Sequence, residues 1–592
     1  MEVKLIGENN YFGNMQGQFF KNRGIDNYLE FINLKNYKPT DTFDFYNMRK
    51  ASQFLVANQG KNLCVLEDYD MDGIASTGVI YNYVTTYMDF DVKVAQHKKK
   101  VHGIKMKELE EYGILEWADI LIVPDAGTND FEEHRILKEK YNIDVICIDH
   151  HASEKYSDHA IVINNQLSNL SKNLTGSAMS YKFIQALDYL LGEDGADDFL
   201  DIVALGLIGD MADIRDLEVQ YLIRKGIENI KNDFFRTIVK ENFNINENEL
   251  SPTVLSFSII PMINACTRVA TFEEMQCITN AICNIDNGED YEHTFIRGKR
   301  KGVTIKEDIY QHAHRVAQKV KSRQDSIVNK AFLGSKRPLK SGLIELLEAR
   351  DVGNKDNKII VVDVTGYIEN SGLSGLLANK IMAQYDKPTL VLHRSGYEYR
   401  GSGRGNQIPM LRTRLKESKI VKFAEGHEPA FGVRIDADST ITEINDGLND
   451  YFNLEITTDI TSVDFIIDNN DIDNYLLKDF EALEEFYGTG LKPPLIYIEN
   501  VLIKTNTINT GSKSNLLKFK YNDVDFVKFK MSEAQLEDLI PWDSNVCYNV
   551  LCTPNLNDFN GKRNMQLIID KIEVVELYTG EEKKEEDTTF EW

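Results

Sequence analysis

An acidic segment at residues 68–73, DYDMDG, places three carboxylates at alternate positions directly after the apolar run LCVLE. Asp68, Asp70 and Asp72 would repel one another unless cations hold them together, and hard oxygen ligands favour Mg²⁺ or Mn²⁺. DxDxDG also opens a calcium-binding EF-hand loop, but the twelfth position is Val79 here instead of Glu, and the preceding run is typical of a strand. The segment therefore predicts a site for Mg²⁺ or Mn²⁺.

Three further groups that can bind a metal follow later apolar runs. Asp125 follows ILIVP, the triplet Asp149-His150-His151 ends DVICIDHH, and Asp210 follows IVALGLIG. Each of these groups alone is compatible with a cap or a turn. Four such groups at successive element ends of one α/β domain form the arrangement that a two-metal phosphoryl-transfer site needs, with ions about 4 Å apart.

The elements that must position these groups lie between residues 62 and 212, where short apolar runs alternate with helical stretches. This alternation predicts a parallel sheet with covering helices, in which ligands gather beyond the carboxyl ends of the strands. The expected strands are 62–67, 119–125, 144–151 and 160–165, and the expected helices are 76–88, 177–191 and 198–210.

The rest of the chain predicts further units, as its 592 residues require at roughly 150 residues per domain. A stretch without Gly or Pro at 304–329 predicts a long polar helix between two domains. Beyond it, 358–368, 372–386 and 388–394 indicate a smaller α/β unit, and the alternation in 493–577 indicates a β-barrel. In that barrel we expect Phe519, Phe526 and Phe529 to lie in the core and the lysines between them to face outward.

Composition limits the partners and the location. The net charge of −26 argues against non-specific wrapping of nucleic acid, so contacts must come from local basic patches, for which 97–100, 297–301, 336–337 and 562–563 are candidates. No run of about 18 apolar residues and no leader pattern is present, so we expect a cytoplasmic protein without a membrane span. The seven cysteines form no CxxC pair, and neither a disulfide framework nor a zinc site is expected.

DYDMDG, VPDAG, IDHH and GLIGDMADI are similar, in order, to the four successive motifs of the DHH phosphoesterases. FSIIPMINACTR, GLSGLLANKIMAQYDKP, GSGRG and NDFNGKRNMQLIIDKI extend the likeness to RecJ-type exonucleases of that family. The resemblance implies an α/β fold with a parallel-sheet DHH catalytic domain, a smaller α/β DHHA1 domain joined by a long helix, and a C-terminal β-barrel of the OB-fold type. The implied units are 1–300 (DHH with an N-terminal extension), 301–335 (connecting helix), 336–450 (DHHA1), 451–578 (OB) and 579–592 (acidic tail).

The resemblance also implies residue roles. Asp70 and Asp125 would bind one Mn²⁺ or Mg²⁺ ion, and Asp72, Asp125, His150 and Asp210 would bind a second. Asp149 would contact the ligands and orient them. Catalytic roles fall to Asp68, His151, Arg268, Arg404 and His427. The residues that would contact the substrate are Asn264, Arg404 with a glycine-rich loop of Gly401, Ser402 and Gly403, and Lys98, Lys99 and Lys100.

The implied function is processive 5′→3′ hydrolysis of single-stranded DNA to mononucleotides by a monomer, in DNA repair, recombination or replication. A single-strand-binding protein or another replication or repair protein is a candidate partner. Asn370-Ser371-Gly372 stands where RecJ-type proteins usually carry a histidine, which leaves the polarity open. Two alternatives remain: a phosphodiesterase for short oligonucleotides or cyclic dinucleotides, and a non-catalytic replication scaffold. The acidic tail is expected to be inert, with a docking peptide as the alternative.

Overall fold

The structure is a computed structural model that describes residues 1–168, 170–242, 250–286, 288, 290–296, 298–299, 301–336, 339–354, 356–405, 407–455, 460–511, 515–531, 533–540, 545–559 and 562–578. The expected tail 579–592 lies outside the described residues, as do Arg297, Arg300 and Arg337 and the side chains at 336, 427 and 562–563. Within the described ranges, no helix combines the length and the apolarity needed to cross a membrane.

A five-stranded parallel sheet carries the acidic segments, in the order β3-β2-β4-β5-β6. Its strands are β2 (Asn62–Glu67), β3 (Asp91–Gln96), β4 (Ile120–Pro124), β5 (Asp144–Asp149) and β6 (Ile161–Asn164). The inner strands are buried almost throughout, as expected where helices cover both faces. The four strands expected from the sequence are confirmed. The edge strand β3 was not predicted, since its segment DVKVAQ lacks the continuous apolar run by which the other four strands were recognised.

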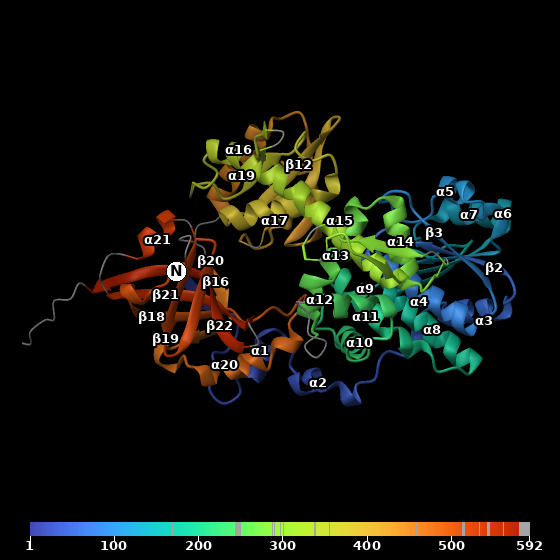
Figure 1. The fold of residues 1–592 in the computed structure, drawn as a ribbon, viewed down its shortest axis with the longest axis horizontal. Coiled ribbons are helices and arrows are strands. Elements are labelled where there is room, and N and C mark those ends of the chain that lie inside the picture. The colour runs from blue at the N-terminus through green and yellow to red at the C-terminus, as the bar shows by residue number, and fades with distance from the viewer. Residues whose placement is uncertain are drawn as a thin grey trace, which may run out of the picture.

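Helices cover both faces of this sheet, at the right of Figure 1. One face packs against α4 (Met71–Tyr87), α8 (Gly176–Leu191) and α9 (Leu200–Gly209), and the other against α5 (Met106–Glu111), α6 (Ile114–Trp117) and α7 (Phe131–Tyr141). The same unit contains α3 (Met48–Ala57), α10 (Leu217–Glu228), α11 (Asp233–Glu241), α12 (Pro252–Ser258), α13 (Ile260–Val269), α14 (Phe272–Ile282) and the hairpin β7 (Tyr291–Thr294) and β8 (Thr304–Glu307).

A 25-residue helix, α15 (Ile309–Leu333), joins this unit to the next. It begins at Asp308, whose side chain caps the helix reciprocally with Gln311, so residues 304–307 form strand β8 and not the first helical turn that the sequence predicted. The helix contacts α11, α13 and α14 near its start and α16 and α17 further on. It is therefore buried along one side and bridges two units, as expected.

The second unit is a smaller mixed sheet in the order β11-β12-β13-β15-β14. It contains β11 (Ile360–Asp363), β12 (Thr389–Ser395), β13 (Glu398–Arg404), β14 (Phe423–His427) and β15 (Ala430–Asp436), with α16 (Leu343–Ala349), α17 (Ser374–Tyr385), α18 (Leu411–Glu417) and α19 (Ile441–Glu455). A two-stranded ribbon, β9 (Ser335–Lys336) and β10 (Leu339–Lys340), precedes it.

The C-terminal sheet is barrel-like and runs in the order β17-β18-β21-β22-β20-β19. Its strands are β17 (Phe465–Ile467), β18 (Ile496–Lys504), β19 (Leu516–Tyr521), β20 (Val524–Phe529), β21 (Asn545–Phe559) and β22 (Lys562–Tyr578), with α20 (Asn474–Glu481) and α21 (Glu533–Leu539). Phe519 and Phe526 are buried and stack with ring centroids 5.1 Å apart, as expected. Phe529 is 58% exposed, so its expected place in the core is wrong.

The first 32 residues pack against the barrel and not against the parallel sheet (Figure 1). Strand β1 (Glu2–Leu5) pairs with β16 (Ile460–Val463), while α1 (Met15–Asn22) and α2 (Tyr28–Ile32) bury Phe19, Phe20 and Phe31. Phe20 and Phe31 lie against Phe486, with ring centroids 5.8 and 6.0 Å away. The N-terminal segment is therefore joined to the other end of the chain.

Candidate metal centre

The segment DYDMDG forms the junction between β2 and α4. Asp70 is the N-cap of α4, and its Oδ1 accepts hydrogen bonds from the backbone N–H groups of Asp72 (3.0 Å) and Gly73 (3.1 Å). This use of a carboxylate explains why the helix starts here, and the helix N-terminus favours negative charge. Asp68 and Asp72 are each 1% exposed, so both carboxylates are withdrawn from solvent.

Asp72 is held by the start of α8. Its Oδ1 accepts hydrogen bonds from the Thr175 hydroxyl (2.8 Å) and from the Ser177 backbone N–H (3.2 Å), and the N–H also lies 3.3 Å from Oδ2. The sequence pattern did not point to Thr175 or Ser177, because they belong to the beginning of a helix and carry no charge.

Asp125 follows β4 with a φ of +64°, a left-handed conformation that costs free energy for any residue but glycine. Its backbone N–H donates to the Ile148 carbonyl of the neighbouring strand at 2.7 Å, which fixes the turn. The side chain is 1% exposed, and its Oδ1 accepts no hydrogen bond from the residues that the structure describes. A strained turn thus presents a buried carboxylate oxygen that lies 3.2 Å from a ring nitrogen of His150.

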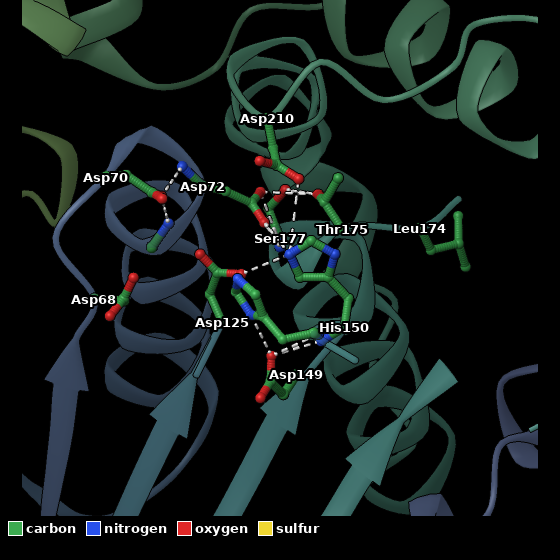
Figure 2. Close-up of polar contacts among 12 residues, drawn as sticks. Asp68, Asp70, Asp72, Asp125, Asp149, His150, Leu174, Thr175, Ser177 and Asp210 are labelled. Atoms are coloured by element: carbon green, nitrogen blue, oxygen red, sulfur yellow. Dashed lines mark hydrogen bonds and ion pairs between the residues drawn. The ribbon is translucent and has the colours of Figure 1, made fainter. Parts of the chain in front are cut away.

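Three carboxylates surround the ring nitrogen Nε2 of His150 (Figure 2). This nitrogen lies 3.2 Å from Asp125 Oδ1, 3.7 Å from Asp210 Oδ2 and 3.9 Å from Asp72 Oδ2. Asp210 is the C-cap of α9. The sequence placed these four residues at the ends of separate elements, and the structure brings them together.

Asp149 has a different role from its neighbours. Its Oδ1 accepts hydrogen bonds from the backbone N–H groups of His150 (2.7 Å) and His151 (3.0 Å), and its Oδ2 accepts from the Thr128 N–H (3.0 Å). The ring Nδ1 of His151 lies 2.8 Å from the same Oδ1. Burial alone would raise the pKa of Asp149, but the His151 ring and these N–H groups hold that pKa below its usual range. Asp149 therefore orients the histidine pair.

The electrostatics of the cluster favour a bound cation. Burial and then the charge of Asp72 raise the pKa of Asp125 well above its usual value, and burial and then Asp72 and Asp70 raise the pKa of Asp210 to about 8. Within the described ranges, no Lys or Arg forms an ion pair with Asp70, Asp72, Asp125 or Asp210. Crowded carboxylates of this kind are stable as anions only when positive charge is close.

The donor set also fits the group that the sequence predicts. Carboxylate oxygens and one imidazole suit Mn²⁺ and Mg²⁺, which prefer hard ligands. Among the described residues no cysteine joins this cluster, which disfavours a structural zinc site. The buried Asp125 Oδ1 accepts no hydrogen bond from the described residues and so remains available to a cation. One grouping with ligand atoms within 4.8 Å of one another consists of Asp125, His150 and His151.

Two glycines make room for this cluster because they carry no side chain. An ideal Cβ on Gly176 would lie 2.4 Å from Asp125 Oδ1, and one on Gly206 would lie 2.4 Å from Asp72 Oδ1. Both glycines have ordinary helical positions in α8 and α9, so only the three-dimensional structure reveals their importance.

Two arginines lie between the parallel-sheet unit and the unit with the smaller sheet. Arg268 on α13 and Arg404 at the end of β13 are both partly buried, and burial lowers the pKa of Arg268 while burial and the nearby Arg268 lower that of Arg404. Nη1 of Arg268 donates to the Asn264 carbonyl at 3.1 Å, and Nη1 of Arg404 donates to the Gly403 carbonyl at 2.7 Å. In the part of the chain that the structure describes, neither guanidinium pairs with a carboxylate, which suits both to an anion.

The glycine-rich segment near Arg404 is a strand and not the loop that the sequence predicted. Gly401, Ser402 and Gly403 lie within β13, which pairs with β12 on one side and β15 on the other. A Cβ on Gly401 would lie 1.9 Å from the Val391 carbonyl oxygen, so glycine is required here for strands to approach closely. The backbone N–H groups serve the sheet, and the expected N–H cradle for phosphate is wrong.

The other predicted contacts come from the loop after β3 or have side chains outside the described part. Lys98 pairs with Glu111 and lies 5.4 Å from the Tyr112 ring centroid, whereas Lys99 and Lys100 are exposed in the loop after β3. His97 is buried, with its Nδ1 2.6 Å from Glu108, so it does not belong to an exposed basic patch. His427 lies in β14, but its side chain lies outside the described part.

Comparisons with known proteins agree with this architecture. A family model described as the DHH family, N-terminal domain, matches residues 62–207, and one described as the RecJ OB domain matches residues 463–571. A solved crystal structure of RecJ in complex with Mn²⁺ from Thermus thermophilus has a TM-score of 0.69 at 18% identity, covering 97% of this chain and 79% of that one. This likeness shows the fold and confirms the fold class expected from the sequence.

Two sequence relatives extend over nearly the whole chain. The protein named "Putative SPbeta prophage-derived single-strand DNA-specific exonuclease YorK" of Bacillus subtilis is 31% identical over 594 residues, covering 97% of this chain and 98% of that protein. The single-stranded-DNA-specific exonuclease RecJ of Bacillus subtilis is 22% identical, covering 97% of this chain and 70% of that protein. With one relative aligned end to end and both the parallel sheet and the barrel matched by family models, the chain belongs to the RecJ-like DHH/DHHA1 family of exonucleases.

Proposed function

We propose that this protein is a nuclease that hydrolyses phosphodiester bonds in single-stranded DNA with two divalent ions, Mn²⁺ or Mg²⁺. The observation that carries the proposal is the convergence of Asp72, Asp125 and Asp210 on His150 Nε2, with a buried Asp125 oxygen that accepts no hydrogen bond from the described residues. The full-length relatives named as single-strand DNA-specific exonucleases support the choice of substrate.

The ion assignment is the one that the family resemblance implies. Asp70 and Asp125 would hold one ion, and Asp72, Asp125, His150 and Asp210 the other, so that Asp125 serves both. When bound, such ions lower the pKa of a coordinated water and neutralise charge on the phosphate. Asp149 keeps the ring of His151 in one orientation through Nδ1, which leaves the other ring nitrogen available to the substrate.

The two arginines provide the anion-binding part of the proposal. Arg268 and Arg404 come from different units and lie close enough for one charge to lower the pKa of the other. Helix α13, which carries Arg268, also packs on α4 and α9, the helices next to Asp72 and Asp210. A phosphate between the guanidiniums would relieve their repulsion through charge-assisted hydrogen bonds. Asn264, one turn before Arg268, and Ser402 beside Arg404 are the polar neighbours of this phosphate site.

Replacing Gly375 by Ala is expected to weaken DNA binding by displacing Arg404. An ideal Cβ on Gly375 would lie 2.3 Å from Arg404 Nη2, so the guanidinium must move. We expect the KM for single-stranded DNA to rise about tenfold, as for one lost hydrogen bond to a charged group, with Mn²⁺ affinity unchanged. Gly353→Ala is the control, since the nearest atom to its Cβ is 3.9 Å away. A wild-type KM in Gly375→Ala would contradict the role of Arg404.

The finer parts of the proposal are 5′→3′ polarity, release of mononucleotides, and a role in DNA repair, recombination or replication. The barrel would contact the strand through its exposed side chains, including Phe529 and Lys520, because exposed aromatic rings stack on bases and lysines follow the phosphates. Action as a monomer in the cytoplasm, and contact with a single-strand-binding protein or another replication or repair protein, belong to the same proposal.

The experiment that tests the function uses single-stranded DNA labelled at the 5′ or the 3′ end, with Mn²⁺, Mg²⁺ or EDTA. Immediate release of labelled mononucleotide from the 5′ end, dependent on metal, is the expected result. Early release from the 3′ end would keep the chemistry and reverse the polarity. Cleavage of very short oligomers alone would indicate a small-substrate phosphodiesterase, and no cleavage of any substrate would indicate a non-catalytic scaffold.

A further inference from the structure

A histidine outside the four acidic segments lies at the metal centre. His102 belongs to the loop 97–105, between β3 and α5, and its Nδ1 lies 2.6 Å from Oδ2 of Asp68, 34 residues earlier in the chain. The Asp68 side chain is fully buried, whereas the His102 side chain is 52% exposed. The carboxylate therefore fixes one side of the ring and leaves the rest accessible.

The loop that carries His102 is anchored directly after this residue. The Ile104 backbone N–H donates to Asp130 Oδ2 at 2.7 Å, and Gly103 adopts a φ of +70° with its Cα so close to Asp130 that an ideal Cβ would lie 2.3 Å from the same oxygen. The Lys105 ammonium donates to the His102 carbonyl at 2.6 Å. These hydrogen bonds thus fix the turn that positions the imidazole.

The ion sites of the proposed function are unequal in their ligands. One ion would have four protein groups, whereas the ion at Asp70 would have only Asp70 and Asp125. His102, Asp68 and Asp70 each offer a ligand atom, and these atoms lie within 4.8 Å of one another. The second oxygen of the same carboxylate, Asp68 Oδ1, is buried and accepts no hydrogen bond from the described part of the chain, so positive charge close to Asp68 is favoured.

We propose that His102 is an additional protein ligand of the ion at Asp70 and that Asp68 positions it. This inference rests on the proposed function and concerns its less complete ion site. Histidines that bind metals usually donate their second ring N–H to a carboxylate, which fixes the ring and raises its basicity. The Asp68 carboxylate lies against Nδ1 of His102 in this way, just as the Asp149 carboxylate lies against Nδ1 of His151.

The test measures Mn²⁺ binding by calorimetry on the metal-free full chain, without DNA. Wild type is expected to bind two ions. His102→Gln is expected to weaken one of the two sites at least about tenfold and to leave the other unchanged, since partners of metal ligands are worth 10- to 100-fold in affinity and a ligand is worth at least as much. Asp68→Asn is expected to weaken the same site. The control is His159→Gln, which removes a partly buried histidine elsewhere in the same unit.

A double variant separates positioning from independent binding. If Asp68 acts through His102, the double variant loses no more affinity than His102→Gln alone. Thermal unfolding in EDTA shows that each variant is folded. Two Mn²⁺ sites of wild-type affinity in folded His102→Gln would overturn the inference and leave the proposed function intact. A wild-type chain that binds no Mn²⁺ would instead overturn the two-ion function on which the inference rests.

Discussion

Replacing Asp125 by Asn is expected to abolish DNA hydrolysis while leaving the metal-free protein folded and at least as stable as wild type. Asp125 would serve both ions, so the neutral amide removes a ligand from each. Because metal ions contribute several kcal/mol of charge stabilisation in the transition state, we expect turnover to fall at least about a thousandfold. Calorimetry with Mn²⁺ should show the loss of both sites.

The stability of the same variant follows from the electrostatics of the cluster. Burial and then Asp72 hold the pKa of Asp125 well above its usual value, so the folded metal-free protein keeps a proton that the unfolded chain releases. The stability of metal-free wild type therefore falls as pH rises above about 4, the ordinary pKa of Asp, toward the raised folded value. Asparagine carries no titratable proton, so Asp125→Asn should gain most over wild type at the upper end of that window.

Thermal unfolding in EDTA at pH 5 and pH 8, repeated with Mn²⁺, measures this difference. Mn²⁺ should raise the melting temperature of wild type and not that of Asp125→Asn, because a ligand stabilises only the state that binds it. Asp144→Asn is the matched control, since Asp144 begins β5 and pairs with Lys138, far from the strand's other end. An Asp125→Asn protein that still cleaves DNA at a rate near wild type would rule out the ion assignment.

The sequence predicted the metal centre because its residues follow strongly apolar strands. In a parallel sheet such strands end at one edge, so Asp70, Asp125 and His150 had to meet there once the strands were recognised. The order of the four acidic segments added the family, while the stretch without Gly or Pro at 304–329 and the alternation at 493–577 predicted the connecting helix and the barrel. The features that could be predicted are thus those that short sequence segments and their order determine.

The remaining features depend on contacts between segments that carry no pattern of their own. His102 meets Asp68 only because β3 is the neighbour of β2, and β3 itself was not recognised. The glycine-rich segment at 401–403 resembles a loop in sequence, but Gly401 is required by the close approach of β12, and Gly403 leaves room for the Phe431 ring. The first 32 residues gave no sign that they would cover the barrel at the other end of the chain.

Replacing Gly176 by Ala is expected to damage the metal centre without removing any polar group. The position lies in the first turn of α8, where alanine by itself favours the helix by up to about 1 kcal/mol. The added methyl group would, however, lie 2.4 Å from Asp125 Oδ1 and 2.5 Å from its Cβ, closer than atoms can approach. Rotation of the carboxylate would relieve only the contact with Oδ1, because the Asp125 Cβ itself lies too close. Therefore α8 and the strained turn at Asp125 must move apart, which displaces the carboxylate from the ions.

A displacement of about 1 Å at a reacting centre costs about a hundredfold in rate, and we expect a fall of that size in turnover with weaker binding of both Mn²⁺ ions. Gly447→Ala is the control, because Gly447 lies in helix α19 and its added methyl meets only the flexible end of Ile420 at 3.2 Å. Wild-type Mn²⁺ affinity in Gly176→Ala would mean that Asp125 can bind from another rotamer, and the close packing of α8 against β4 would then not define the site. Loss of Mn²⁺ binding in a stable, folded Gly176→Ala protein would instead show that the space left by one glycine is as necessary to the centre as the carboxylates themselves.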